Sequence, residues 1–360
     1  MILKKTIIYL LITLNVSVIA QIGGTRTFSF LELPVPARSN ALGGASMAIW
    51  DKDVNLGYSN PALLNPSASK QLAFNYVNFV SDLNYGNFLY AFQLKEYGTF
   101  AAGLQYFNYG KFDGRDEYDK ETGTFKAADY SLNLSFAKTL DKDSTFSIGV
   151  ALKTIYSHYD IYNSFGSAID VGLTYHNKKQ FTVSLLAKNY GKQWKPYTEN
   201  GPKEKLPTDF QVGFSKKIPK APFRVIFQYY QLLKWDLTYV NPQVQSGDID
   251  PFTNKPIVKT AKQKRNDKIK TGFDKFGRHL VIGTEIILGK NFMIRVAYNF
   301  RKGKEMALPD VKKANGLSLG FGFKVYKFHL DYAYSKYALT GNSHTIGITT
   351  NLNFFHKAAK

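Results

Sequence analysis

Residues 292–301 of the 360-residue chain read FMIRVAYNFR, and this stretch shows the pattern that decides the fold. Large apolar or aromatic residues occupy every second position, with smaller or polar residues between most of them. Successive side chains of a β-strand point to opposite faces, so the alternation predicts a strand with two different faces. The same pattern recurs along most of the chain, for example at 130–137, 146–153 and 317–325, while helical periodicity is nearly absent.

About 14 such segments are present, each as long as the roughly 9–11 residues that a tilted strand needs to cross a bilayer. They are 70–79, 85–95, 98–109, 128–140, 144–158, 165–177, 179–189, 207–217, 222–235, 277–289, 291–301, 316–326, 327–336 and 343–355. Most long connections follow odd-numbered strands, at 110–127, 159–164, 190–206, 236–276 and 302–315. Short turns at one end and long loops at the other are typical of outer-membrane barrels, whose short turns face the periplasm.

The sequence therefore predicts an all-β fold, a transmembrane outer-membrane β-barrel of about 14 antiparallel strands over residues 70–356, in a Gram-negative bacterium. A secreted β-sandwich or propeller would also alternate, but its polar face would carry many charges. Here the second face is rich in Gly, Ser, Ala, Asn and Thr, which suits a crowded lumen. A spanning sheet must also close, because lipid offers no partner for backbone polar groups.

The N-terminus predicts a cleaved signal peptide over residues 1–20. Lys4 and Lys5 precede an apolar run that ends at Ile19, and this run is shorter than the roughly 20 residues of a spanning helix. Export argues against nucleic acid as a partner, although 47 Lys and Arg against 27 Asp and Glu give a formal net charge of +20. The lack of cysteine excludes disulfides, thiolate metal sites and a cysteine nucleophile.

Residues 21–69 do not alternate and are interrupted by Gly and Pro, for example at Gly43, Gly44 and Pro61. Short helices are predicted within 37–49 and within 61–65. Since a large barrel leaves an interior that needs filling, we expect this segment to be an N-terminal plug or hatch.

The stretch ARSNALGGA at 37–45, followed by Asp51, Asp53 and NPALL at 60–64, resembles the N-terminal signature of the PorV/PorQ outer-membrane proteins of type IX secretion. These proteins are relatives of the FadL long-chain fatty-acid channels. Residues 72–78 and 110–125 extend the resemblance, which covers most of the chain and is greatest for the PorQ-type members. The motif residues assigned to the plug are Gly43, Gly44, Asn60, Pro61 and Ala62.

The resemblance implies a role in the attachment complex of type IX secretion. PorQ-type proteins work there with the surface protein PorZ, in a complex that processes cargo proteins and attaches them to anionic lipopolysaccharide. It thus implies a noncatalytic barrel, monomeric within a hetero-complex, that holds a PorZ-like partner at the surface. It implies no catalytic residue and no cofactor.

Two other functions are weighed against this one: a FadL-like channel for hydrophobic substrates, and an outer-membrane lipid-modifying enzyme. No histidine has a partner at metal-ligand spacing, and we predict no metal site. Ser67 to Lys70 and Lys270 to Gly272 imitate the S-x-x-K and K-T-G motifs of serine β-lactamases. Ser67 precedes the first strand and Lys270 lies in a polar loop, so we interpret the match as coincidence. The acidic residues of loop 110–127 are interpreted as solvated.

The predicted loop 236–276 carries the densest positive charge, with Asp267 as the one acidic residue in the run. The basic residues are Lys255, Lys259, Lys262, Lys264, Arg265, Lys268 and Lys270. The run is either a solvated loop or a contact for anionic groups. Such groups are the phosphates and carboxylates of lipopolysaccharide and outer-membrane lipids, or an acidic face of a partner protein.

Overall fold

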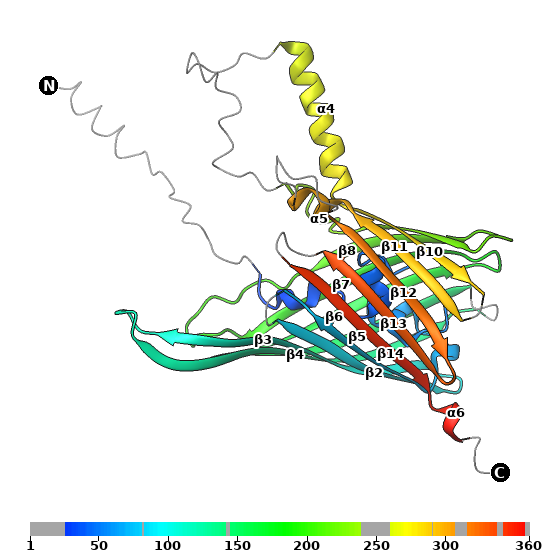
Figure 1. Ribbon diagram of the computed structural model, residues 1–360, viewed down its shortest axis with the longest axis horizontal. Coiled ribbons are helices and arrows are strands. Elements are labelled where there is room, and N and C mark those ends of the chain that lie inside the picture. The colour runs from blue at the N-terminus through cyan, green and yellow to red at the C-terminus, as the bar shows by residue number, and fades with distance from the viewer. Residues whose placement is uncertain are drawn as a thin grey trace.

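Figure 1 shows the computed structural model of the chain, in which a ring of strands surrounds a segment of short helices. The structure describes residues 26–80, 83–141, 145–238, 260–289, 291–306, 315–336 and 341–356. The predicted signal peptide, residues 1–20, lies outside the described residues. No helix within these ranges has both the length and the apolar character needed to cross a membrane.

The strands form one closed antiparallel barrel, β1 to β14, in which each strand pairs with its sequence neighbours and β1 pairs with β14. This confirms the predicted fold class. The bounds are β1 Gln71–Asn78, β2 Asn84–Leu94, β3 Gly98–Arg115, β4 Glu121–Thr139, β5 Phe146–Tyr159, β6 Tyr162–His176, β7 Phe181–Lys195, β8 Asp209–Lys217, β9 Phe223–Tyr229, β10 Leu280–Leu288, β11 Phe292–Asn299, β12 Leu317–Val325, β13 Phe328–Lys336 and β14 Asn342–Asn351. Every residue of β1 has a partner in β14, so the seam between the first and last strands is closed.

The alternation in the sequence becomes an inner and an outer face of the barrel. In β5, Ile148 and Val150 are exposed on the outside, while Ser147 is buried in the lumen. Outer rings also pack against each other across strands, and the centroids of the Tyr106 and Tyr130 rings lie 5.1 Å apart. A belt of exposed apolar and aromatic side chains suits contact with lipid, where it would be unfavourable in water.

The predicted loop 110–127 is wrong in large part, because β3 continues to Arg115 and β4 already begins at Glu121. Beyond a register shift the two strands pair again, and Phe112 stacks on Phe125 with 5.2 Å between ring centroids. Such a cross-strand aromatic pair stabilises a hairpin. The predicted acidic loop is therefore the tip of a hairpin that extends beyond the other strands (Figure 1).

The predicted loop 236–276 is also wrong in part, because Ala261–Gly277 form helix α4. The helix begins with a capping box: the Gln263 N–H donates to Thr260 Oγ1 at 3.3 Å, and the Thr260 N–H donates to Gln263 Oε1 at 2.8 Å. This pair satisfies two N–H groups that have no partner within the helix. A second helix, α5 (Phe300–Glu305), occupies the start of the predicted loop 302–315.

Two further strand boundaries differ from the predicted ones, and a residue with a left-handed backbone conformation lies at each. Asp160, with φ of 56°, lies in a tight turn between β5 and β6, in place of the predicted loop 159–164. Gln231, also with φ of 56°, follows the end of β9 at Tyr229, before the predicted end at residue 235. At the C-terminus β14 ends at Asn351, and the short helix α6 (Asn353–His356) replaces the last predicted strand residues.

The segment before β1, residues 26–69, lies inside the barrel (Figure 1) and is called the N-terminal segment below. Its elements are η1 Ser29–Glu32, α2 Ala37–Ala41, α3 Val54–Ser59, η2 Pro61–Leu63 and η3 Pro66–Ala68. Helices α2 and η2 lie where the sequence predicted short helices. Because α2 packs against β11 to β14 and β1 while η2 packs against β4, β5 and β6, the segment crosses the lumen from wall to wall.

Glycines in the barrel wall leave room for this segment. A Cβ added at Gly149 would collide with the backbone of Pro61 and Ala62, and one added at Gly172 would collide with the Asn60 side chain. In β12, Gly320 faces Ala41 of α2 in the same way. The small inner residues of the strands are therefore contact sites for the N-terminal segment.

Replacing Gly172 by leucine tests this packing. The side chain would occupy the space of Asn60, so we expect overpacking to cost about 1–3 kcal/mol of stability and to displace the N-terminal segment. Heat-induced unfolding and limited trypsin digestion of the purified protein in detergent measure both effects. Gly272→Ala on α4, where an added Cβ meets no atom within 4 Å, is the matched glycine control. Unchanged trypsin resistance in Gly172→Leu would contradict the assignment.

Candidate functional site in the barrel lumen

Three neighbouring strands carry opposite charges at the same level of the barrel. Glu285 of β10 lies directly opposite Arg224 of β9 and Arg295 of β11. All three side chains are buried, and Glu285 and Arg295 are 0% exposed. Arg224 Nη1 donates to Glu285 Oε2 at 2.6 Å, and Arg295 Nε donates to Glu285 Oε1 at 3.0 Å. The register of the sheet thus places a buried carboxylate between two guanidinium groups.

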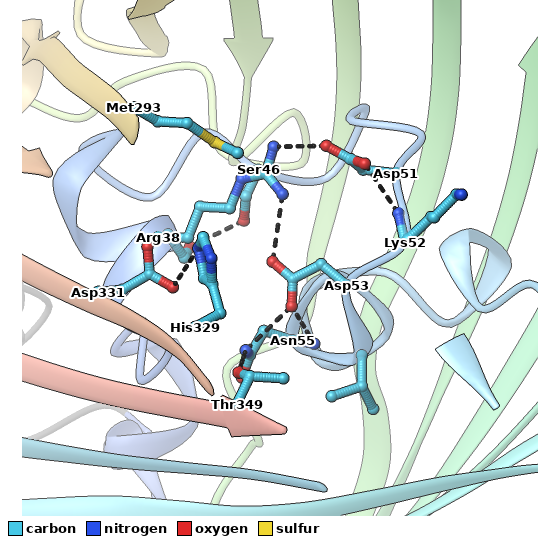
Figure 2. Close-up of polar contacts among 12 residues, drawn as sticks. Arg38, Ser46, Asp51, Lys52, Asp53, Asn55, Met293, His329, Asp331 and Thr349 are labelled. Atoms are coloured by element: carbon cyan, nitrogen blue, oxygen red, sulfur yellow. Dashed lines mark hydrogen bonds and ion pairs between the residues drawn. The ribbon is translucent and has the colours of Figure 1, made fainter. Parts of the chain in front are cut away.

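The N-terminal segment supplies a third guanidinium, that of Arg38 on α2. Its Nε and Nη2 donate to the two carboxylate oxygens of Glu285 at 2.8 and 2.9 Å, the bidentate geometry that arginine favours. Its Nη2 also donates to Asp51 at 3.0 Å, and its Nη1 donates to Asp53 at 3.2 Å. Figure 2 shows Arg38 reaching both of these carboxylates. One side chain therefore ties the barrel wall to two acids of the N-terminal segment.

The ion network continues along the wall to β13. Arg295 Nη1 donates to Asp331 Oδ1, and the other oxygen of Asp331 lies 3.2 Å from His329 Nε2 (Figure 2). Burying charges is costly unless each is paired and hydrogen-bonded. Here Glu285 and Asp331 each accept from guanidinium groups, so the cost is offset and the arrangement fixes where α2 lies.

Two of the family-motif residues end α2. Gly43 and Gly44 have φ of 65° and 98°, a region that favours glycine. Their N–H groups donate to the carbonyls of Asn40 and Ser39 at 3.0 and 2.9 Å, which closes the helix. Gly43 also lies close to β10, since an added Cβ would be 3.2 Å from Val281 Cγ1.

The other motif residues join two turns of the N-terminal segment. Asn60 is fully buried, its Oδ1 accepts from the Ala62 N–H at 3.0 Å, and its Nδ2 donates to the Met47 carbonyl at 2.9 Å. Pro61 occupies the first position of η2, where a missing N–H costs nothing. The motif therefore shapes the segment against the wall.

A cavity of about 390 Å³ lies on one side of the N-terminal segment. It is lined by Arg38 and His329 of the ion network and by Lys324 and Lys327, which flank the short turn between β12 and β13. This cavity is at the short-turn end of the barrel, the periplasmic end of such proteins.

A second cavity of about 390 Å³ lies on the other side of α2, towards the long connections. Its wall holds two buried acceptors, Asp209 Oδ1 and Gln228 Oε1, which have no hydrogen-bond partner among the described residues. Burial lowers the pKa of Lys302 on α5 to about 7, and neighbouring Arg301 lowers it as well. Ser39 lines this cavity while its chain neighbour Arg38 lines the first, so α2 separates the two.

The structure does not bring the predicted basic run to the lumen. Lys262, Arg265, Lys268 and Lys270 are exposed on α4. Lys264 also belongs to α4, but its side chain lies outside the described part, and Lys255 and Lys259 lie outside the described residues altogether. The lumen network and the basic helix are therefore separate features.

His329 and Asp331 form an acid–base pair that the sequence analysis did not predict. They lie two positions apart on the same face of β13, where strand geometry brings them together. A serine hydrolase needs a hydroxyl bonded to such an imidazole, and among the described residues the His329 imidazole bonds to Asp331 alone. Ser67, in η3, lines the short-turn cavity, whereas Lys270 is on α4 beyond the opposite end.

In the described ranges no group of three His, Asp or Glu side chains is arranged to hold a metal ion.

A family model for the type IX secretion system protein PorV matches residues 20–218, more than half of the chain. The chain belongs to the PorV family. The matched region contains the N-terminal segment and strands β1 to β8, including Arg38 and the five motif residues. No curated protein sequence matches this chain.

The fold is similar to that of solved outer-membrane channels. A TodX monoaromatic hydrocarbon channel with the ΔS2S3 mutation is 13% identical, with 88% of this chain and 98% of that chain covered and a TM-score of 0.52. The toluene transporter TodX of Pseudomonas putida is 12% identical, with 87% and 96% covered and a TM-score of 0.49. A FadL homologue of Pseudomonas aeruginosa is 10% identical, with 88% and 98% covered and a TM-score of 0.48.

At such identities the likeness concerns the fold alone. Together, the closed barrel of β1 to β14 and the PorV family place the protein in the outer membrane of a Gram-negative bacterium. The family also makes the protein a barrel component of the type IX secretion system.

Glu285→Ala tests the ion network. Three buried guanidinium groups would lose their shared acceptor, so we expect a loss of about 3–5 kcal/mol in stability. Heat-induced unfolding in detergent measures this loss. Glu121→Gln in the β3–β4 hairpin is the control, because Glu121 is 77% exposed and its nitrogen–oxygen distance to Arg115 is 3.8 Å. The network has no stabilising role if Glu285→Ala unfolds at the wild-type temperature.

Proposed function

We propose that this protein is a noncatalytic barrel of the type IX attachment complex, with a PorQ-type role. It holds a PorZ-like partner at the cell surface, where cargo proteins are processed and attached to anionic lipopolysaccharide. Family membership supports the secretion context. The finer role rests on the resemblance of the motif at 37–64 and on the geometry of the lumen.

The observation that carries the proposal is the fixed N-terminal segment. Arg38 binds Glu285 of β10, and Asn60 fits against Gly172 of β6, so the segment is held at two separate parts of the wall. A segment held in this way acts as a plug and suits a rigid platform. A conduit would need the segment to move, which means breaking a buried ion network.

The long-connection end supplies a surface for a partner. The β3–β4 hairpin extends beyond the other strands (Figure 1), and its tip presents Tyr118 at 82% exposure. Exposed aromatic side chains are common in the central contacts of protein interfaces. The hairpin is thus a candidate contact surface for the partner.

Deletion of the gene tests the attachment role. We expect the PorZ-like partner to be released into the medium and cargo proteins to lack lipopolysaccharide, because the partner has lost its membrane attachment. Immunoblots of cell and medium fractions measure both, and the wild-type gene on a plasmid is the control. Normal retention of cargo on the deletion strain would exclude the role.

A transport channel is the second candidate. It is favoured by the cavity of about 390 Å³ at the long-connection end and by the fold shared with the TodX mutant channel at a TM-score of 0.52. For transport, the N-terminal segment would have to leave the position that separates the two cavities.

A disulfide between the segment and the wall distinguishes the two functions. The chain has no cysteine, and a Cβ built at Gly347 lies 3.1 Å from Ala37 Cβ, so Ala37→Cys with Gly347→Cys gives one designed bridge. The Asn75 side chain, whose Oδ1 is 2.6 Å from that Cβ, must move aside to admit it. We expect cargo attachment to be the same with and without reductant. The serine pair at the same positions is the control. Loss of cargo attachment on oxidation, restored by reductant, would favour a moving segment and a channel.

A further inference from the structure

Helix α4 carries an exposed apolar stripe on an otherwise basic surface. Ile269, Phe273 and Phe276 are 51%, 74% and 48% exposed. Their spacing of four and three residues places them on one face of the helix. Lys262 and Arg265 extend the same face towards the N-terminus of the helix. In water, an apolar stripe of this kind is unfavourable.

The stripe joins the lipid-facing side of the barrel. In β9, Arg224, Ile226 and Gln228 are buried in the lumen, so Tyr229 points outward. Phe276 packs on this Tyr229 ring with 5.2 Å between centroids. The apolar face of α4 is therefore continuous with the belt of the barrel that contacts lipid.

The acidic residue near the base of α4 is engaged within the protein, which leaves the exposed surface basic. Asp274 accepts from Arg278 Nε at 2.8 Å and lies 3.2 Å from Lys304 Nζ. These cations lower the pKa of Asp274 despite the opposing effect of its partial burial. Lys275 is held by Asp236 at 2.7 Å, so the base of the helix is attached on two sides.

The helix lies outside the ring of strands (Figure 1). Figure 1 shows α4 standing away from the side of the barrel at the end with the long connections. Trp235 lies at its base, 58% exposed and stacked on His279. Tryptophan is enriched at the boundary between lipid and water.

We propose that α4 is an interfacial helix that binds the outer leaflet of the membrane. Ile269, Phe273 and Phe276 contact acyl chains next to the barrel, and the flanking cations bind lipid phosphates. These cations are Lys262, Arg265, Lys268 and Lys270. A basic helix with one apolar face is the arrangement that binds anionic membrane surfaces. The proposal is independent of the secretion role and requires only the outer-membrane location.

The apolar stripe of α4 adjoins the lipid-facing belt of the barrel, and this favours a membrane over a partner protein as its binding partner. A helix that docks a protein from the outside would turn its apolar face away from the barrel belt. In α4 the stripe begins at the outward-facing Tyr229, where lipid is already the neighbour.

The absence of natural cysteine allows single labels on α4 of the full-length protein. Phe273→Cys and, as control on the other face, Thr271→Cys carry an environment-sensitive fluorophore. The labelled proteins are reconstituted in vesicles of phosphatidylcholine with phosphatidylglycerol, and in vesicles of phosphatidylcholine alone. We expect the label at 273 to be quenched several-fold more than the label at 271 by lipid that carries a nitroxide near the top of its acyl chain. Iodide in the water should show the reverse order.

A charge variant tests the phosphate contact. In this variant, Lys262, Arg265, Lys268 and Lys270 are replaced with glutamine. In anionic vesicles, the label at 273 should then be quenched by nitroxide lipid no more than the label at 271. Heat stability should be unchanged. Gly272→Ala, which keeps the charge, should retain the stronger quenching at 273. Equal iodide quenching at 271 and 273 overturns the proposal. Protection of the label at 273 only when a surface-protein extract is added also overturns it, in favour of a protein partner.

Discussion

In the hydrocarbon core of a membrane, each backbone N–H and C=O must find its partner within the protein. The pairing of β1 with β14 along the whole of β1 meets this requirement, because it removes the two free edges that a sheet would otherwise expose. Once the sheet is closed, one face of every strand meets lipid and the other meets the lumen. The period-two pattern of the sequence follows from that constraint.

Closure also creates an interior that must be filled and neutralised. Inner positions carry Gly, Ser and Asn that fit the N-terminal segment, as Gly172 does for Asn60. Several charged inner residues are grouped so that an acid meets its bases, as when Glu285 accepts from Arg38, Arg224 and Arg295. Such a cluster adds little stability compared with apolar packing, but breaking it is costly, and it therefore specifies one position for the segment.

Beyond the membrane the constraint no longer applies, since water satisfies backbone groups. The architecture is accordingly less regular at the end of the barrel with the long connections. The β3–β4 hairpin extends past its neighbours, and helices α4 and α5 follow strands β9 and β11. These elements carry the exposed aromatic and basic side chains of the protein's proposed contacts, while the barrel holds them in place.

The sequence by itself determined the closed barrel, the positions of most strands and the short helices of the N-terminal segment, because each follows from local patterns of polarity and turn residues. It did not determine the extension of β3 and β4 through 110–127, where polar residues resemble a loop and the aromatic pair of Phe112 and Phe125 forms only after pairing. The Thr260–Gln263 capping box is a local signal for α4, but where its apolar face lies relative to the barrel depends on the contact with Tyr229.

The ion network was decided by tertiary structure alone. Glu285 is a single acid in the strand LVIGTEIIL, and nothing beside it in sequence indicates a partner. Its three guanidinium groups come from residues 38, 224 and 295, which meet only when the strand register is set and the N-terminal segment enters the lumen. Local patterns therefore determine the strands of the barrel wall, whereas contacts between distant residues determine the ion network and the position of the N-terminal segment in the lumen.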